Sequence, residues 1–441
     1  MPRVVTLYLK QDNRYIAYTL LKRYFDNSFY VADLLSSYLN NSTLLTQDKK
    51  YINNLVLGTI RMKGKYDYIL SDLYDGDYLK LKSGVKYILY IGLYQVDSME
   101  STPDHAALSV CVDITKDKFP GLDRLVNAIL RNYLRKKDKY KIIESEISSH
   151  QILSHPEWLI RRWIKNFGFN KTKEISNFNN SSQAVWFRIN KDIDKKSVIQ
   201  TLNSNNNNFK EHQINSSYFS INNPHELIQS KLFTNGKLSI QNPINGYIVD
   251  LLDPQNSDKI IDGCSAPGGK GSLIAHRAPD AKIYSIDNNS KRLEMVKETM
   301  ERQSIKNIEI LNMDISRERL PLSNKVLLDV PCSGTGVINR RIDIKWRRTQ
   351  KELELVKDMQ YRIIENASKY LKKDGILVYS TCSIEPEENE LLIEEFLENH
   401  KFVVEDASDF VNKNIVQKGA IINLPGAFGM DGGYAIRLRK L

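Results

Sequence analysis

Apolar residues recur three and four positions apart through the first 140 residues of the chain. This spacing places apolar side chains on one face of an α-helix, and Gly or Pro falls in several of the connections between the runs. The clearest runs are Tyr15 to Tyr24, Asn54 to Met62, Val85 to Gln95 and His105 to Thr115. We therefore predict a compact all-α domain over residues 1–140.

The pattern changes after this domain. Residues 141–180 are predicted to form a basic helical linker, and strand-like runs then alternate with a helical one. These runs are Ala184 to Ile189, Ile193 to Leu202 and Tyr218 to Ile221. The linker and a small α+β subdomain are thus expected to occupy residues 141–239, with Asn203 to Asn208 as a solvated loop, because Asn favours turns.

Short apolar runs that end in an acid begin after residue 240. Lys259 to Asp262 is the first, Lys282 to Asp287 the second and Ile308 to Asp314 the third, and the acids are spaced by 25 and 27 residues. Each interval fits one strand and its crossover helix. Ligands of such sheets bind beyond the carboxyl ends of the strands, so the three acids are expected to line one crevice.

Further strands and helices complete the predicted C-terminal domain. The strands are Val326 to Cys332, Gly375 to Ser383 and Tyr434 to Leu438, and the amphipathic helices are Gln350 to Leu371 and Glu387 to Asn399. Alternation of this kind favours a doubly wound, mostly parallel α/β sheet of Rossmann-like type. We predict this domain over residues 240–441.

A glycine-rich loop follows the first of these strands. Gly268 and Gly269 allow the backbone to approach a ligand closely, and the amides of the next helix can bind an anionic group. The loop does not match a P-loop, because Gly263 lies one residue too far from Gly269-Lys270 and Gly271 replaces the metal-binding hydroxyl. Asp287, at the end of the second strand, is well placed to accept both hydroxyls of a ribose. The pattern predicts a nucleotide-type ligand.

Two cysteines stand just past predicted strand ends. Cys332 follows Asp329-Val-Pro, and Cys382 lies in Thr381-Cys-Ser383. A single cysteine there is usually a buried packing residue, but two at one edge, one of them beside an acid, favour thiol chemistry. The other cysteines are Cys111 and Cys264, and the absence of repeated Cys-x-x-Cys pairs argues against a disulfide scaffold or a structural metal site.

The net charge of +10 and the isoelectric point near 9.1 favour a polyanionic partner, although Lys spread evenly over solvated faces gives the same total. Basic residues outnumber acids from Arg131 to Lys173, and Trp158, Trp163, Phe167 and Phe169 are interleaved with them. We predict that this stretch faces RNA. No run of some 18 apolar residues and no signal peptide is evident, so a cytoplasmic protein without a membrane partner is expected.

Three motifs together carry a specific resemblance. Asp262-Gly-Cys-Ser-Ala-Pro-Gly-Gly-Lys270, Asp329-Val-Pro-Cys332 and Thr381-Cys-Ser383 resemble the signature motifs of the Nop2/Sun family of RNA cytosine-C5 methyltransferases. The resemblance implies S-adenosylmethionine as cofactor, no metal, and a last strand that is antiparallel. Four further segments resemble the bacterial Sun-type (RsmB) enzymes of 16S ribosomal RNA, which carry an N-terminal NusB-like RNA-binding domain: Leu89 to Gln95, His105 to Leu108, Val126 to Arg131 and His155 to Trp158.

The chemistry of methylation at carbon 5 of cytosine suggests roles for the two cysteines, Asp329 and Lys270. Carbon 5 is a poor nucleophile, so a thiolate must first add to carbon 6, and an acid near N3 and N4 assists. Asp329 is placed for that assistance, and Lys270 to orient Asp329 or to lower a thiol pKa. Spacing alone does not assign the thiols, because DNA cytosine-C5 methyltransferases use the cysteine of a Pro-Cys motif like that of Cys332. The resemblance implies that Cys382 is the nucleophile and that Cys332 assists product release.

Cofactor contacts are also implied by the resemblance. They fall to Cys264, Ser265, Ala266, Pro267, Gly268, Gly269 and Lys270 of the loop, and to Asp287, Arg292, Asp314 and Asp329. The chain departs from the family pattern at Asn242 and Asn245, where a Gln-Asp/Glu-x-x-Ser sequence is usual, and at Gly433, where an aromatic residue is common. The competing hypotheses are a non-enzymatic RNA-binding or antitermination factor and a DNA cytosine-C5 methyltransferase.

Overall fold

The computed structural model describes residues 9, 11–99, 102–146, 150–190, 193–204 and 208–441. The chain divides into two compact units. Unit 1 contains Met1–Asn180 and Lys345–Arg347, and unit 2 contains Ser181–Ile344 and Arg348–Leu441.

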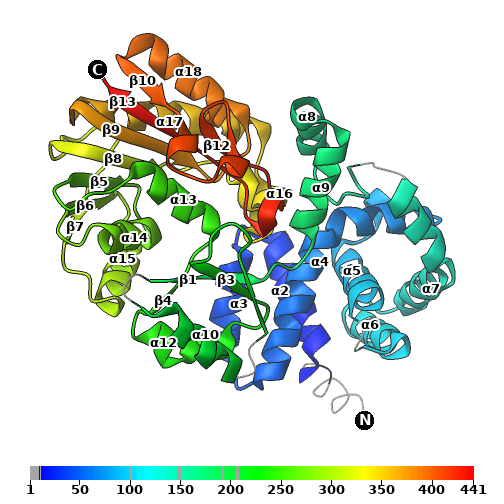
Figure 1. The fold of residues 1–441 in the computed structure, drawn as a ribbon. Coiled ribbons are helices and arrows are strands. Elements are labelled where there is room, and N and C mark those ends of the chain that lie inside the picture. The colour runs from blue at the N-terminus through cyan, green and yellow to red at the C-terminus, as the bar shows by residue number, and fades with distance from the viewer. Residues whose placement is uncertain (1–8, 10, 100–101, 147–149, 191–192, 205–207) are drawn as a thin grey trace. The chain divides into compact units, whose positions relative to one another are not determined.

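Unit 1 is helical, as the spacing of its apolar residues predicts (Figure 1). Its elements are α2 (Asn13–Asp26), α3 (Val31–Asn40), α4 (Thr46–Leu73), η1 (Tyr78–Lys80), α5 (Ser83–Ser98), α6 (Asp104–Lys118), α7 (Asp123–Glu146), α8 (Glu157–Phe167) and α9 (Phe169–Asn180). Helix α5 is buried on almost every side and packs against α2, α4, α6 and α7. Such a helix forms the centre of a core rather than its surface. None of the described helices is long and apolar enough to cross a membrane.

One glycine of α5 sets how closely the helices of unit 1 pack. A Cβ atom on Gly92 would lie 2.8 Å from Cδ2 of Leu130 in α7 and 3.3 Å from Sγ of Cys111 in α6. Cys111 is fully buried, and burial raises the pKa of its thiol to about 12. Cys111 is therefore a packing residue.

A small antiparallel sheet begins unit 2. Its strand order is β2-β3-β1-β4, and Phe187 and Phe219 stack in its core. The elements of this part are β1 (Val185–Ile189), α10 (Lys195–Ser204), β2 (Phe209–Glu211), β3 (Tyr218–Ile221), α11 (His225–Gln229), α12 (Lys231–Thr234) and β4 (Leu238–Ile240). The predicted α+β subdomain is confirmed, although Asn203 belongs to α10 rather than to a loop, and residues 205–207 of the Asn run lie outside the described residues.

A mixed sheet forms the rest of unit 2, in the order β11-β12-β13-β9-β8-β5-β6-β7, with β10 paired to β13. Its strands are β5 (Lys259–Gly263), β6 (Lys282–Asp287), β7 (Ile308–Asn312), β8 (Ser323–Asp329), β9 (Leu371–Thr381), β10 (Phe402–Glu405), β11 (Val416–Gln417), β12 (Ala420–Asn423) and β13 (Gly433–Lys440). Strands β5 to β9 are parallel and β13 is antiparallel to β9, as expected. The strand order reverses between β5 and β8, which is where such sheets bind ligands.

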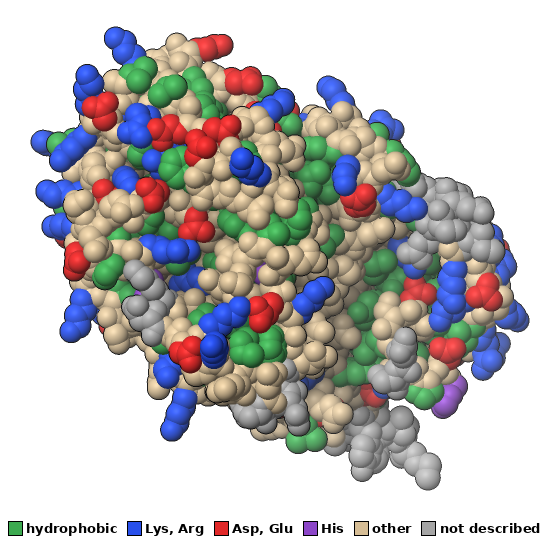
Figure 2. Space-filling model, in the orientation of Figure 1, with side chains coloured by type: hydrophobic (Ala, Val, Ile, Leu, Met, Phe, Trp, Pro, Cys, Tyr) green, Lys and Arg blue, Asp and Glu red, His purple; other side chains and the backbone are tan. Residues whose placement is uncertain are grey.

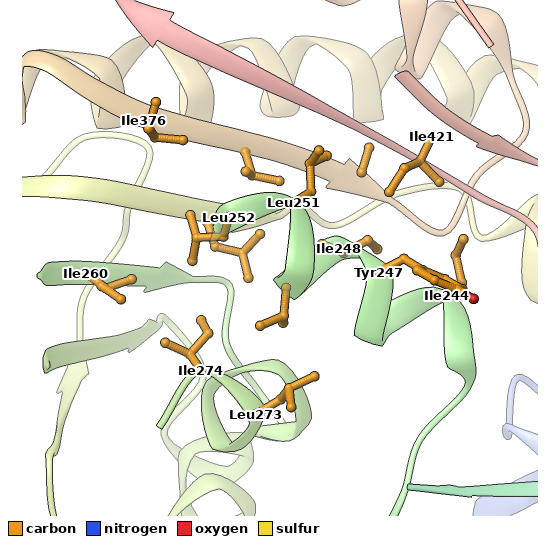
Figure 3. Packing of buried hydrophobic residues seen from close by; sticks show 14 of the residues in the cluster. Ile244, Tyr247, Ile248, Leu251, Leu252, Ile260, Leu273, Ile274, Ile376 and Ile421 are labelled. Carbon is orange, nitrogen blue, oxygen red and sulfur yellow. The ribbon is translucent and has the colours of Figure 1, made fainter. Parts of the chain in front are cut away.

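Helices cover both faces of this sheet (Figure 1). They are α13 (Pro243–Leu252), α14 (Gly269–Arg277), α15 (Ser290–Arg302), α17 (Gln350–Lys369) and α18 (Glu390–Asn399). The chain also forms α16 (Ile342–Arg347) and the short 3-10 turns η2 (Thr335–Val337), η3 (Pro386–Glu388), η4 (Ala407–Asp409), η5 (Lys413–Ile415) and η6 (Ala427–Gly429). Figure 3 shows the cluster on one face, where Leu252 of α13 and Ile274 of α14 gather near Ile260 of β5. The cluster on the other face includes Ile364 of α17 and Phe396 of α18.

Two predicted helices have shorter bounds than their periodicity indicates. The helix predicted from Gln350 to Leu371 ends at Lys369, because Leu371 already belongs to β9. The helix predicted from Glu387 begins at Glu390, since Pro386 opens a separate 3-10 turn that ends at Glu388. This turn lies beside the cysteine at the end of β9.

The residues of the basic stretch from Arg131 to Lys173 differ in burial and in ion pairing. Trp163 is fully buried and Phe169 is exposed. Lys139 pairs with Asp72, Arg161 with Glu157 and Lys171 with Glu174, whereas Arg135 and Lys136 project from α7 into solvent. On the face drawn in Figure 2, Lys and Arg are spread over the surface and interspersed with Asp and Glu.

Candidate active site

The loop after β5 turns sharply before helix α14 begins. Cys264 has a φ of 58° and Gly268 a φ of 95°, and the second value favours glycine. A Cβ atom on Gly268 would also lie 3.2 Å from Cα of Val296 in α15. The amide of Ser265 donates to the carbonyl of Ile286. The loop is thus held against the end of β6 and the middle of α15.

Asp262 lies inside β5 and is fully buried. Helix α14 covers it closely, because a Cβ atom on Gly271 would lie 2.5 Å from Oδ2 of Asp262. Burial raises the pKa of this carboxyl group to about 8, against the lowering effect of Lys270. Of the three acids expected to line the crevice, Asp262 is therefore buried beneath it and has no side-chain surface exposed to solvent.

Asp287 and Arg292 brace the loop from the neighbouring strand and helix. Asp287 ends β6, and its carboxylate accepts hydrogen bonds from the amides of Ala266 (3.2 Å) and Asn289 (3.0 Å). Nη2 of Arg292 donates to the carbonyl of Ala266 at 2.6 Å. Asp287 is buried, and its Oδ2 accepts from the loop that is expected to carry the cofactor.

Asp314 follows β7 after Met313 and is partly exposed. Its carboxylate accepts from the amide and the hydroxyl of Ser316 and pairs with Arg317 at 2.9 Å. The hydrogen bond from the Ser316 hydroxyl lowers the pKa of Asp314, so this residue is an anion at neutral pH.

Lys270 and Asp329 form an ion pair. Nζ of Lys270, in the first turn of α14, lies 2.6 Å from Oδ2 of Asp329 at the end of β8. The other carboxylate oxygen accepts a hydrogen bond from Oγ of Ser380 in β9 at 3.0 Å. Asp329 is thereby fixed from both sides, and its side chain remains 34% exposed, so that one face is open to a ligand.

The two predicted thiols meet at the same edge. Sγ of Cys332 lies 2.9 Å from Sγ of Cys382, both are free cysteines and both are partly exposed. Strands β8 and β9 are parallel neighbours in which Asp329 pairs with Ser380. Because both strands end at one edge, the cysteines that follow them come together although 50 residues separate them in the chain.

The two thiols are electrostatically different. The pKa of Cys382 is lowered by its hydrogen bond with Cys332, and Arg341 and Lys270 act in the same direction. The pKa of Cys332 is raised well above its usual range, first by this hydrogen bond and then by burial. The arrangement therefore favours a thiolate on Cys382 and a proton on Cys332.

The structure explains the departure at Asn242 and shows the surroundings of those at Asn245 and Gly433. Asn242 caps helix α13, because its side chain accepts from the amide of Ile244, and Asn and Asp are equally good caps. Nε2 of Gln241 donates to the carbonyl of Gly269 and so holds the loop. Asn245 is partly buried within α13. A Cβ atom on Gly433 would lie 3.0 Å from the carbonyl of Thr381, so a larger residue there requires adjustment beside Cys382.

Sequence reasoning missed three residues of this edge. Ser380 is the second partner of Asp329, Arg341 affects the pKa of Cys382, and Glu388 is a fully buried acid beside both cysteines. The available signal was the acid run Glu385-Pro-Glu-Glu388 shortly after Cys382. Which acid of this run turns inward depends on the tertiary structure, so the sequence alone does not single out Glu388.

Family models match three consecutive stretches of the chain. The model described as the NusB family matches residues 11–135, and the one described as the RsmF/B-like methyltransferase, ferredoxin-like domain, matches residues 155–227. The model described as 16S rRNA methyltransferase RsmB/F matches residues 249–439. The fold class predicted for the chain is confirmed.

Named relatives and solved structures agree with these matches. Proteins of Yersinia pestis bv. Antiqua (strain Angola) and Yersinia pseudotuberculosis serotype O:1b, both named ribosomal RNA small subunit methyltransferase B, are 32% identical over 363 residues, covering 80% of this chain and 83% of each relative. The crystal structure of PH0851 has a TM-score of 0.77 and 20% identity over 97% of this chain and 98% of that one, which shows likeness of fold alone. A methyltransferase homolog from Pyrococcus horikoshii has a TM-score of 0.57 and 26% identity, covering 66% of this chain and 98% of its own. Because the named relatives match most of both chains, this chain belongs to the ribosomal RNA small subunit methyltransferase B family.

Proposed function

We propose that this protein transfers a methyl group from S-adenosylmethionine to carbon 5 of a cytosine in 16S ribosomal RNA, through a covalent bond between Cys382 and carbon 6. The observation that carries the proposal is the pair of thiols 2.9 Å apart, beside the Lys270–Asp329 ion pair. Membership of the family supports methylation of ribosomal RNA by a methyl donor of this type. The two thiols supply the argument for the position on the base.

The residues around the loop fit S-adenosylmethionine. Oδ1 of Asp262 and Oγ of Ser265 are buried polar atoms with no hydrogen-bond partner in the described part of the chain, as expected of groups that await a ligand. When bound, the cofactor supplies an electrophilic methyl group. We propose that the loop from Cys264 to Lys270 would hold it, with contacts from Asp287, Arg292, Asp314 and Asp329.

The thiols divide the proposed reaction between them. The Cys382 thiolate attacks carbon 6 of the cytosine, the carbon 5–carbon 6 π bond breaks, and its electrons make carbon 5 nucleophilic. As the thiolate adds, N3 takes up a proton from solvent, and the Asp329 carboxylate, held by Lys270 and Ser380, would accept hydrogen bonds from N3–H and N4–H and so promote the addition. Once the methyl group is on carbon 5, Cys332 loses its thiol proton to solvent and, as a thiolate, accepts the carbon 5 proton. The electrons of the carbon 5–hydrogen bond reform the double bond, and the Cys382–carbon 6 bond breaks to release the Cys382 thiolate.

A methylation assay tests this proposal directly. The purified protein is incubated with a methyl-labelled cofactor and with either 16S ribosomal RNA or duplex DNA. We expect label in the RNA alone, and 5-methylcytosine on digestion. Label in DNA supports a DNA methyltransferase instead. RNA binding without any label supports the non-enzymatic factor.

A further inference from the structure

A buried carboxylate lies behind the two thiols. Glu388, at the end of η3, has no exposed surface. Its Oε2 accepts hydrogen bonds from the amide of Ser333 (2.8 Å) and Nε2 of Gln360 (2.9 Å), and its Oε1 accepts one from Oγ of Ser383 (2.7 Å). All three donors are uncharged, so this acid is satisfied by hydrogen bonds alone.

The donors lie immediately next to the cysteines. Ser333 follows Cys332 and Ser383 follows Cys382 in the chain, and the two serine hydroxyls are 3.0 Å apart. Gln360 of α17 also donates to the carbonyl of Pro331 at 2.9 Å. One carboxylate therefore links the loop after β8, the loop after β9 and helix α17.

The position of Glu388 is itself fixed from β9. The hydroxyl of Tyr379 donates to the carbonyl of Glu388 at 2.7 Å. Thr381 bonds the side chain of Asn389 at 2.6 Å, and Nδ2 of Asn389 donates to the carbonyl of Ser383 at 3.1 Å. With the backbone of η3 held in this way, the carboxylate can fix the two loops rather than follow them.

The two sulfurs face different sets of charges. The pKa of Cys332 is raised by its hydrogen bond to Cys382, by burial, and by the charges of Cys382, Glu388 and Asp329. Cys382 faces Asp329 as well, but Arg341 and Lys270 lower its pKa. Glu388 thus opposes ionisation of Cys332, whereas the cations favour ionisation of Cys382.

We propose that Glu388 is a positioning residue that holds the two cysteine loops together and keeps the shared proton on Cys332, leaving Cys382 as the attacking sulfur. The assignment of Cys382 as nucleophile rests on the proposed function. The positioning itself is a property of the free protein, so it can be measured without RNA or cofactor.

The test compares Glu388→Gln with Glu398→Gln, an exposed acid of α18, in the full chain. The amide keeps the shape and most hydrogen bonds but removes the charge. Limited alkylation with iodoacetamide over a range of pH, read by mass spectrometry of the two cysteine peptides, reports which sulfur is ionised. We expect the ratio of Cys332 to Cys382 labelling to rise roughly tenfold in Glu388→Gln, equivalent to about one pKa unit, and to be unchanged in Glu398→Gln.

Methylation measured in parallel separates the two proposals. We expect Glu388→Gln to lower kcat without changing KM for the cofactor. An unchanged labelling ratio in a folded Glu388→Gln overturns the role of Glu388, whether or not the wild type methylates RNA. A wild type that makes no 5-methylcytosine overturns the proposed function instead, whatever the labelling shows.

A second variant covers the case in which Glu388→Gln does not fold. Ser383→Ala removes one donor to the carboxylate and leaves its charge in place. We expect slower closure of a Cys332–Cys382 disulfide by diamide and a lower kcat, with cofactor affinity retained. Wild-type rates of both reactions in this variant overturn the positioning role.

Discussion

At the scale of single residues, the two sulfurs of the site are chemically distinct. The pKa of Cys382 is lowered and that of Cys332 is raised, so we expect removal of each sulfur to have a different consequence. We expect Cys382→Ala neither to methylate nor to retain RNA through denaturation, because no sulfur attacks carbon 6. Cys332→Ala should add, transfer the methyl group and then stall, giving a labelled, slower band on a denaturing gel.

Two other outcomes of this pair of variants would contradict the assignment of Cys382 as nucleophile. An adduct that accumulates in Cys382→Ala and is absent from Cys332→Ala assigns the attack to Cys332, as in the DNA enzymes. No adduct in either variant, with a modest loss of stability in each, makes both cysteines packing residues.

Asp287 gives a prediction about the cofactor. Asp287→Ala removes the acceptor expected for the ribose hydroxyls and also releases the amides of Ala266 and Asn289. We expect S-adenosylmethionine to bind roughly 1.5 to 3 kcal/mol more weakly, about ten- to a hundredfold. Calorimetry with the exposed Asp280→Ala as control measures this, and equal affinities would remove Asp287 from the cofactor site.

The buried Asp262 predicts how stability depends on pH. The carboxyl group ordinarily titrates at 3.8, whereas burial raises its pKa in the folded chain to about 8. The folded state therefore keeps a proton that the unfolded state has lost. This contribution is fully present below pH 3.8 and is lost as pH rises through 8, by up to about 1.4 kcal/mol for each pH unit.

Asp262→Asn removes this titration. In the ligand-free protein we expect unfolding free energies that fall less steeply between pH 5 and 8, and a higher Tm at pH 8 than the wild type has. Denaturant unfolding at several pH values measures both. A slope equal to that of the wild type would mean that Asp262 is ionised at little cost.

At the scale of secondary-structure elements, the parallel pairing of β8 with β9 is what brings the thiols together. Diamide should therefore close a disulfide between Cys332 and Cys382 within one chain and abolish methylation, and dithiothreitol should restore it. Cys111 and Cys264 should stay reduced, because burial raises the pKa of each. Peptide mapping identifies which cysteines form the disulfide. A different pairing would contradict the register of the two strands.

At the scale of the whole molecule, the excess of positive charge predicts salt-dependent RNA binding. Arg135 and Lys136 are the better probes on α7, because Nζ of Lys137 already donates to the carbonyl of Val96. We expect reversal of both to Glu to weaken RNA binding and to reduce the slope of log affinity against log salt by roughly 1 to 2. Cofactor affinity should not change. An unaltered slope would make this part of α7 an ordinary solvated face.

The sequence by itself determined the class of each part of the chain. Apolar spacing predicted the helical N-terminal domain and the mostly parallel sheet, because periodicity is a local property of the chain. The motifs also predicted which residues gather at one edge, since parallel strands end on the same side. The local pattern gave the wrong start for one helix: the helix predicted from Glu387 begins at Glu390, after a 3-10 turn.

Only the tertiary structure decided how the residues of that edge act on one another. It paired Lys270 with Asp329, buried Asp262 beneath Gly271, and turned Glu388 inward to reach Ser333 and Ser383. Spacing left the two cysteines equivalent candidates, whereas hydrogen bonding and the surrounding charges make their pKa values diverge. The physical reason is that desolvation and Coulomb interaction depend on distances between segments remote in sequence, and no local pattern contains those distances.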